Sequence, residues 1–218
     1  YYRDNEEAYD DMLYNHEQLS KKTWFAGGAW VWSGFAPTNA WSLESMLPAM
    51  RSCAEHGVEN IFMTMWGDNG GECSFWARLP SLYAVRRFYD GVFDMEQIKR
   101  EFAELTGERF DDMMLLDLPI DLGKLQYISG APHKSAPYND AFLGLFDKAL
   151  LPGVTDQYAA MAERLSPLAE SDSAFAYLYR QMTDLCRLLA VKYDLGLRTR
   201  EAYRAGDKDA LRDLLPVY

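Results

Sequence analysis

Apolar and polar residues alternate along the first part of the chain in blocks that predict helices separated by two short strands. Residues 4–21 place apolar side chains at helical spacing, with acidic residues in the first turn and lysines in the last. The segment from Trp24 to Trp32 is a nearly continuous apolar run with two glycines, which is typical of a strand buried on both faces. A helix over 42–56 and a second strand over 58–65 follow. The predicted order is helix, strand, helix, strand.

Strands joined by single helices indicate parallel βα units. The loops of such units gather at the carboxyl ends of the strands, where a barrel or an open sheet binds its ligand. Two strands cannot close a barrel, and a parallel pair exposes edges that neighbouring strands normally cover. The first residue is Tyr1 rather than a methionine. We therefore expect the true N-terminus, and further strands before Tyr1, to be missing.

From residue 93 onwards the pattern is helical. Asp94 and Gln97 form a capping signal, and Gly107 stands at the stop position of the same helix. The segments expected beyond it are a long connection over 120–138, helices over 138–151, 155–170 and 173–195, and short helices over 197–205 and 207–215. The chain is thus predicted to be mainly α with a minor parallel β part, divided into domains at residues 1–92 and 93–218.

Composition narrows the range of partners. The net charge of −11, from 22 basic and 33 acidic residues, disfavours nucleic acid and anionic membrane surfaces, because phosphates attract an excess of Lys and Arg. No run of about 18 apolar residues is long enough to cross a membrane. The three cysteines contain no CxxC pair, so the sequence suggests neither a disulfide framework nor a zinc site. We expect no metal, a neutral ligand and a reducing, cytoplasmic location.

The tryptophans indicate a candidate site. All six lie in the first 76 residues. Trp66 and Asp68 stand in a glycine-rich turn after the second predicted strand, where an aromatic face, a carboxylate and a close backbone suit a sugar ring. Trp32, with Trp30, lies at the end of the first predicted strand and is expected to form an opposite wall. A single tryptophan is more often a core residue, and we expect this of Trp24 and Trp76.

Two motifs at these strand ends resemble a known family. Phe25-Ala-Gly-Gly-Ala-Trp-Val-Trp32 and Thr64-Met-Trp-Gly-Asp-Asn-Gly-Gly-Glu72 are similar to the last two barrel strands of bacterial family 20 glycoside hydrolases, the β-N-acetylhexosaminidases. The resemblance implies the last βα units of a (β/α)8 TIM barrel over residues 1–92, followed by an α-helical C-terminal domain. Tyr1-Tyr2 resembles the end of a Trp-Asp-Tyr-Tyr segment after the sixth strand, whose Trp-Asp is absent here.

The resemblance also implies roles for individual residues. Tyr2 would hold the acetamide oxygen of the substrate, Trp32 would wall the sugar subsite, and Trp66 and Asp68 would line that subsite, with Asp68 accepting hydrogen bonds from ring hydroxyls. The family reaction is a substrate-assisted, retaining hydrolysis of terminal β-linked N-acetylhexosamine (GlcNAc or GalNAc) that needs no cofactor. Its catalytic Asp-Glu pair is expected upstream of this chain. No catalytic residue is therefore assigned here, and the chain alone is expected to be inactive.

Other readings are weaker. Asp68 and Glu72 lie four residues apart, but nothing in the sequence sets the separation that an acid and base pair requires. A non-catalytic helical module that binds a carbohydrate or a protein would explain the missing Asp-Glu pair. A purely structural interaction domain is disfavoured by the clustering of the tryptophans. Non-acetylated glucosamine also stays open as a substrate, because most of the acetamide pocket lies outside the chain.

Overall fold

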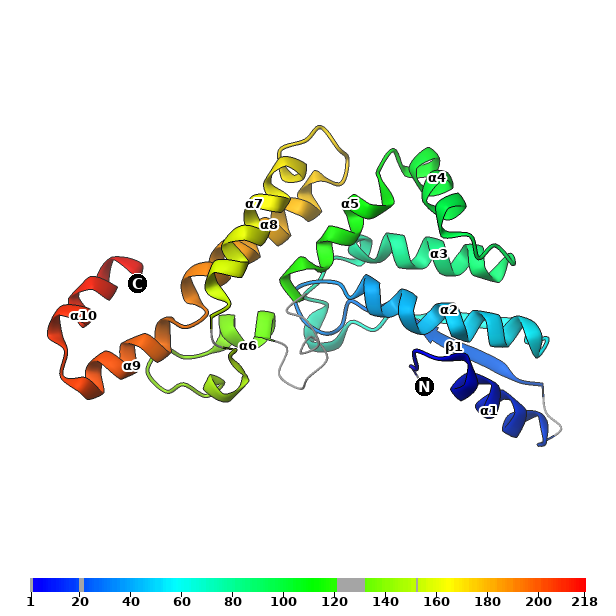
Figure 1. Cartoon of the computed structure of the whole chain (residues 1–218), viewed down its shortest axis with the longest axis horizontal. Helices are drawn as coiled ribbons and strands as arrows, with labels where there is room; N and C mark the ends of the chain where they lie inside the picture. The colour runs from blue at the N-terminus through cyan, green and yellow to red at the C-terminus, as the bar shows by residue number, and fades with distance from the viewer. Residues whose placement is uncertain (1, 20–21, 121–131, 152) are drawn as a thin grey trace. The chain divides into compact units, whose positions relative to one another are not determined.

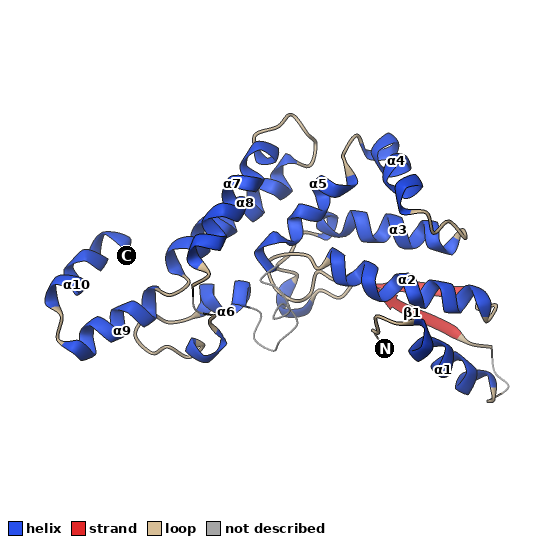
Figure 2. Cartoon of the chain, in the orientation of Figure 1, coloured by secondary structure: helices blue, strands red, loops and turns tan. Residues whose placement is uncertain are grey.

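The computed structural model describes residues 2–19, 22–120, 132–151 and 153–218, which form mainly helices and one small sheet (Figures 1 and 2). This confirms the prediction of a mainly α chain with a minor parallel β part. Two compact units are present, the first made of Tyr1–Ser33 and Pro37–Asp117 and the second of Gly34–Ala36 and Leu118–Tyr218. No helix among the described residues is both long and apolar enough to span a bilayer.

The first unit contains both strands. Its helices and strands are α1 (Glu6–Glu17), β1 (Trp24–Gly28), α2 (Asn39–Glu55), β2 (Asn60–Thr64), α3 (Leu79–Tyr89), α4 (Met95–Thr106) and α5 (Phe110–Met114). Short 3-10 turns lie at η1 (Asp68–Gly70), η2 (Phe75–Arg78) and η3 (Leu115–Ile120), the last of which runs across the boundary between the units.

The two strands pair in parallel, with a helix layer on one face. The register runs from Trp24 opposite Asn60 to Gly28 opposite Thr64. Helix α2 packs against β1 and lies between α1 and α3 (Figure 1). The packing is so close that a Cβ at Gly27 would come within 2.6 Å of the sulfur of Met46, a residue of α2. Because side chains alternate along a strand, Phe62 points to the other face, where it is 49% exposed.

The N-terminus of α2 is capped from a distant part of the chain. Thr38 holds the cap position without a capping side-chain hydrogen bond. Instead the carboxylate of Asp117 accepts the backbone N–H of Ala40 at 2.7 Å and the side-chain amide of Asn39 at 3.0 Å. Asn39 also donates to the carbonyl of Ala77 at 2.8 Å and accepts the Ser81 hydroxyl at 2.9 Å. This buried polar network ties α2 to α3 and to the end of the first unit.

Some details of the first unit differ from the expectations. Strand β1 ends at Gly28, before the two following tryptophans, because the chain turns there toward α2. Helix α3 begins with a proline at its first turn, an accepted start position, and was not predicted. Trp24 and Trp76, expected in the core, are 64% and 51% exposed among the described residues. Trp24 stands at the first position of β1, outside the cover that α2 provides.

The regular elements of the second unit are all helices or 3-10 turns among its described residues. Its elements are α6 (Pro132–Tyr138), the 3-10 turn η5 (Asp147–Ala149), α7 (Thr155–Ala169), α8 (Ala176–Lys192), α9 (Leu195–Ala205), α10 (Lys208–Leu214) and the 3-10 turn η6 (Leu215–Val217). The helices α7 and α8 lie side by side and provide most of its core (Figure 1).

The α7–α8 pair is built from an apolar stripe on each helix. Leu165 of α7 and Leu189 of α8 are fully buried, and the rings of Tyr158 and Tyr193 meet at 5.6 Å. Each of these tyrosines also has a polar partner for its hydroxyl: Tyr158 donates to the carbonyl of Pro119 at 3.2 Å, and Tyr193 accepts the N–H of Leu151 at 2.7 Å. The helices expected over 155–170 and 173–195 are confirmed.

The expected helix over 138–151 is wrong. This segment is a loop after α6 that contains only isolated turns and the short η5 (Asp147–Ala149), and side chains hold much of it. The Asp140 carboxylate accepts the N–H groups of Phe142 and Leu143 at 2.8 and 2.7 Å, and Asn139 donates to Asp147 at 3.0 Å. Such side-chain bonds compete with helix formation. Of the predicted connection over 120–138, residues 132–138 form α6, and 121–131 lie outside the described residues.

The two units meet in sequence after Asp117. Helices α4 and α5 belong to the first unit, because α4 packs on α3 and α5 packs on both. The division predicted at residues 92 and 93 concerns the end of a barrel domain, which the compact units do not test. It stays a prediction.

Replacing Asn39 by alanine is expected to destabilise the first unit. The change leaves the Ala77 carbonyl and the Asp117 carboxylate each short of one hydrogen bond in a buried place, which costs about 1–3 kcal/mol. Urea unfolding followed by circular dichroism measures the loss. The matched control is Glu44→Ala on the exposed side of the same helix, expected within about 0.5 kcal/mol of the wild type. Equal stability of the two variants would contradict the proposed importance of the network.

Candidate functional site

Three aromatic rings gather where β1 ends. The ring of Trp30 lies edge-on to Tyr2 at 4.9 Å between centroids and tilted against Trp32 at 4.8 Å. Tyr2 and Trp32 are 6.2 Å apart. Trp41 of α2 meets Trp30 edge-on at 6.3 Å. We call Tyr2, Trp30 and Trp32 the aromatic cluster. Two of the four residues that the sequence selected, Tyr2 and Trp32, are thus brought together.

The first turn of α2 holds the cluster by its backbone. The hydroxyl of Ser42 accepts the N–H of Trp30 at 2.9 Å, and the N–H of Thr38 donates to the carbonyl of Trp30 at 2.9 Å. The side chain of Arg78 donates to the carbonyl of Ala29 at 3.4 Å. The segment after β1 is therefore fixed by side chains of α2 and η2, although it belongs to no strand.

Tyr2 connects the aromatic cluster to the sheet. Its phenol oxygen lies 3.3 Å from the hydroxyl of Thr64, the last residue of β2. It also lies so close to Gly28, the last residue of β1, that a Cβ there would stand 2.5 Å from the phenol oxygen and 2.9 Å from the ring of Trp32. Tyr2 is thus placed at the carboxyl ends of both strands, where parallel folds bind ligands.

Trp66 and Asp68 lie apart from these contacts. They follow β2 in an exposed turn that closes with Gly70 and Gly71, both at positive φ, a conformation that glycine adopts without strain. Trp66 is 54% exposed and stacks on none of the described aromatic rings. The carboxylate of Asp68 makes no hydrogen bond or ion pair with the described residues. The structure leaves both side chains open to a ligand, and it does not test the roles that the sequence assigned to them.

The cluster is suited to binding rather than to nucleophilic attack. The indole N–H of Trp30 is buried and has no hydrogen-bond partner among the described residues, so it is a donor for a bound group. Cys73, the nearest cysteine in sequence to the glycine-rich turn, is no nucleophile, because burial raises the pKa of its thiol to about 12. No group of three or more His, Cys, Asp and Glu in the described part of the chain is placed to hold a metal ion.

Thr64, Gly28 and Ser42 were missed as functional candidates. Thr64 opens the second of the two motifs and Gly28 lies in the first, so both were inside the segments that carried the resemblance. Nothing in their spacing shows that their positions pair across the sheet, because register depends on tertiary packing. Ser42 was placed only as the start of a helix, although it supports Trp30.

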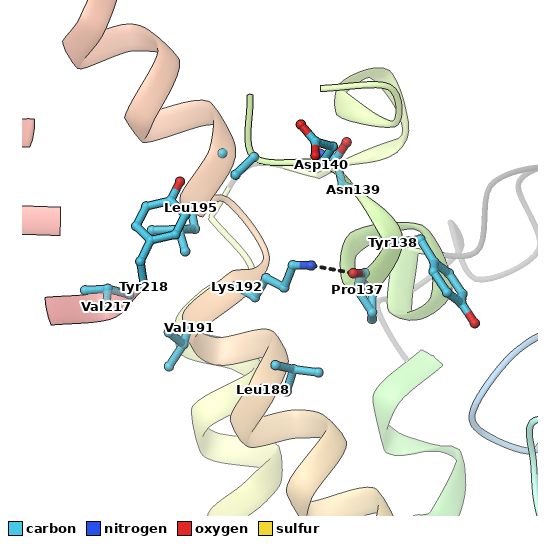
Figure 3. A pocket seen from close by; sticks show the side chains of 12 residues that line it. Pro137, Tyr138, Asn139, Asp140, Leu188, Val191, Lys192, Leu195, Val217 and Tyr218 are labelled. Carbon is cyan, nitrogen blue, oxygen red and sulfur yellow. Dashed lines mark hydrogen bonds between the residues drawn. The ribbon is translucent and has the colours of Figure 1, made fainter. Parts of the chain in front are cut away.

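A pocket lies in the second unit, between α8, the loop after α6 and the C-terminal residues (Figure 3). Its volume is about 530 Å³. Leu188 and Val191 of α8, with Val217 and Tyr218, form apolar walls (Figure 3).

The polar groups of this pocket are already engaged within the unit. Lys192 donates to the carbonyl of Pro137, and Thr199 shares a 2.8 Å hydrogen bond with the hydroxyl of Tyr218. The carboxylate of Asp140 accepts two backbone N–H groups, which lower its pKa below the usual value. Such groups have few bonds left to offer a polar ligand, so the pocket is a weaker candidate for chemistry than the strand ends.

A comparison with models of known protein families identifies the family of the chain. The model of the Glycoside Hydrolase 20C C-terminal domain matches residues 109–217, which is half of the chain. No curated protein matches it. The chain therefore belongs to the glycoside hydrolase 20C family. The resemblance to family 20 that the strand-end motifs indicated is confirmed, and the match lies beyond those motifs, in the helices that resembled the family less distinctively.

Replacing Gly28 by alanine is expected to disturb the aromatic cluster. Gly28 is not among the glycines with positive φ, so the effect is steric: the new Cβ pushes on the rigid rings of Tyr2 and Trp32. Overpacking of this kind costs about 1–3 kcal/mol. Near-ultraviolet circular dichroism, which reports the coupled indoles of Trp30 and Trp32, should change.

The control for this change is Gly67→Ala in the turn after β2. There a Cβ would meet its nearest atom, the Cα of Gly71, at 3.8 Å, an ordinary contact. The control should keep the wild-type spectrum and stability. Identical spectra for both variants would show that Tyr2 and Trp32 do not pack on Gly28 as described.

Proposed function

We propose that this member of the glycoside hydrolase 20C family forms the sugar-binding end of a catalytic barrel and its helical C-terminal domain. The whole protein would then remove terminal β-linked N-acetylhexosamine, GlcNAc or GalNAc, from glycans. One observation carries this proposal: an aromatic cluster stands at the carboxyl ends of two parallel strands in a chain whose following half matches the C-terminal domain of this family.

The sheet supports the barrel part of the proposal. In a (β/α)8 barrel, helices cover the outer face of every strand and side chains fill the inside. Here α2 covers one face of β1, while Phe62 and Thr64 point to the other face. Both outer edges of the pair are open among the described residues. An N-terminal barrel portion would supply the strands that pair with them, so that residues 1–92 complete the barrel and 93–218 form the helical domain.

The proposed reaction divides the work between two parts of the protein. In substrate-assisted, retaining hydrolysis the 2-acetamido oxygen attacks the anomeric carbon, an aspartate orients that group and a glutamate protonates the leaving oxygen. The Asp-Glu pair would come from the upstream barrel portion. This chain would bind the sugar: Tyr2 by hydrogen-bonding the acetamide oxygen, and Trp32 by stacking on the ring.

Trp66 and Asp68 would complete the same subsite. Their exposure leaves an indole face free to stack on the apolar face of a sugar, and a carboxylate free to accept hydrogen bonds from hydroxyls. These are interactions with a neutral glycan, as the net charge of −11 favours. The reaction needs no cofactor. A cytoplasmic location is proposed on the sparse, unpaired cysteines alone.

The first experiment compares the full-length protein with this 218-residue chain on a chromogenic N-acetyl-β-glucosaminide. The full-length protein should release the aglycone, and the chain should not, because its proposed catalytic pair lies upstream. Activity in neither would favour a non-catalytic carbohydrate-binding module. Activity of the chain alone would overturn the upstream position of the acid.

Replacing Trp66 or Asp68 by alanine in the full-length protein is expected to lower kcat/KM by about 10- to 100-fold. Loss of a stacking face or of a hydroxyl contact reduces the stabilisation of the transition state by about 1–3 kcal/mol. Trp24→Ala is the matched control, because Trp24 is also more than half exposed but stands at the amino end of β1. Wild-type kinetics in both site variants, with unchanged circular dichroism, would remove these residues from the subsite.

A further inference from the structure

The contact between Tyr2 and Thr64 joins two segments that are 62 residues apart in the chain. Tyr2 precedes α1, and Thr64 is the last residue of β2. The Thr64 hydroxyl makes two contacts: 2.7 Å to the carbonyl oxygen of Gly27 on the neighbouring strand, and 3.3 Å to the phenol oxygen of Tyr2. A single hydroxyl at the strand end therefore touches both the sheet and the phenol.

The direction of these hydrogen bonds follows from counting hydrogens. A carbonyl oxygen only accepts, so Thr64 donates its one hydrogen to Gly27. Thr64 can then only accept from Tyr2. The phenol hydrogen of Tyr2 points at Thr64, and a relay runs from Tyr2 to Thr64 to Gly27.

The rest of the surroundings limits where the phenol can go. Trp30 meets the Tyr2 ring edge-on at 4.9 Å, and Gly28 leaves room for the phenol oxygen only because it has no Cβ. These two contacts restrict the ring of Tyr2 sterically, but they do not fix the direction of its hydroxyl hydrogen. The hydroxyl of Thr64, by contrast, accepts the hydrogen of the phenol.

We infer that Thr64 is a positioning residue that holds the Tyr2 phenol ready for the acetamide group of the substrate. The inference rests on the proposed function, and it adds a residue to that site that touches Tyr2 rather than the sugar. With the phenol already ordered before the substrate arrives, the substrate does not have to order it on binding.

The weak bond to Thr64 suits this role. An O–H···O hydrogen bond is usually 2.7–2.8 Å long, so the contact of 3.3 Å is loose. The acetamide oxygen is an acceptor, and it can share the phenol hydrogen with the Thr64 oxygen in a three-centre hydrogen bond, so that Thr64 still orients the phenol when the substrate is bound. Thr64 loses little, because its own hydrogen stays on Gly27.

A double-mutant cycle in the full-length protein tests the relay. Thr64→Val keeps the shape of the side chain and removes the acceptor, and Tyr2→Phe removes the phenol hydroxyl. Thr64→Val should lower kcat/KM on the chromogenic N-acetyl-β-glucosaminide by about 2- to 10-fold, as expected for one net hydrogen bond. In the Tyr2→Phe background the same change should have no further effect, because Thr64 acts through that hydroxyl.

Two further variants separate positioning from a structural effect. Thr64→Ser keeps the hydroxyl and removes only the methyl group. It should retain most of the wild-type kcat/KM, which would assign the loss in Thr64→Val to the hydroxyl. Thr106→Val is the matched control, because its hydroxyl also donates to a backbone carbonyl, that of Phe102 at 2.8 Å. It should lower kcat/KM in neither background.

Additive losses in the cycle, or wild-type kinetics of Thr64→Val, would overturn the positioning role. If the full-length wild type releases no aglycone, the proposed function fails, and the relay is judged by the same cycle in urea unfolding. There a non-additive shift of the midpoint upholds the contact between Tyr2 and Thr64, and additive shifts overturn it.

Discussion

The candidate site depends on the carboxylate of Asp117 at the N-terminus of α2. A helix N-terminus presents unpaired N–H groups and a partial positive charge, and a buried carboxylate satisfies both. Asp117 does so at 7% exposure by binding Ala40 and Asn39. The first turn of α2, held in this way, carries Ser42 and Thr38 to the backbone of Trp30. A polar contact between sequence positions 77 residues apart thus sets the place of the aromatic cluster.

The same dependence explains why the site can be rigid although it lies outside the strands. Loops carry binding residues in most folds, but they hold them accurately only when the scaffold supplies hydrogen bonds. After β1 that support comes from α2, and on the Tyr2 side it comes from Thr64 and the open space at Gly28. After β2 the described residues give no such support to Trp66 or Asp68. Half of the proposed subsite is therefore preorganised, whereas no side-chain hydrogen bond from the described residues holds Trp66 or Asp68 in place.

Sequence patterns predicted what depends on local periodicity. The parallel pair β1 and β2, the helix α2 and the long helix α8 follow from apolar spacing and glycine positions. The segment 138–151 was predicted as a helix, whereas in the structure Asp140 and Asn139 bind the local backbone instead. The cap by Asp117 and the relay through Thr64 depend on pairs far apart in sequence. No local pattern contains such information.

The two halves of the chain carry different kinds of information about function. The family match lies in residues 109–217, where the core is an α7–α8 pair whose tyrosine hydroxyls bond to backbone groups. Such a unit is defined by packing, and packing determines a fold and not a reaction. The strand ends lie before residue 109, and the segments that follow them contain a buried donor without a partner among the described residues, the Trp30 indole N–H. Membership of the family thus comes from the helices, while any account of what the protein binds has to be argued from Tyr2, Trp32, Trp66 and Asp68.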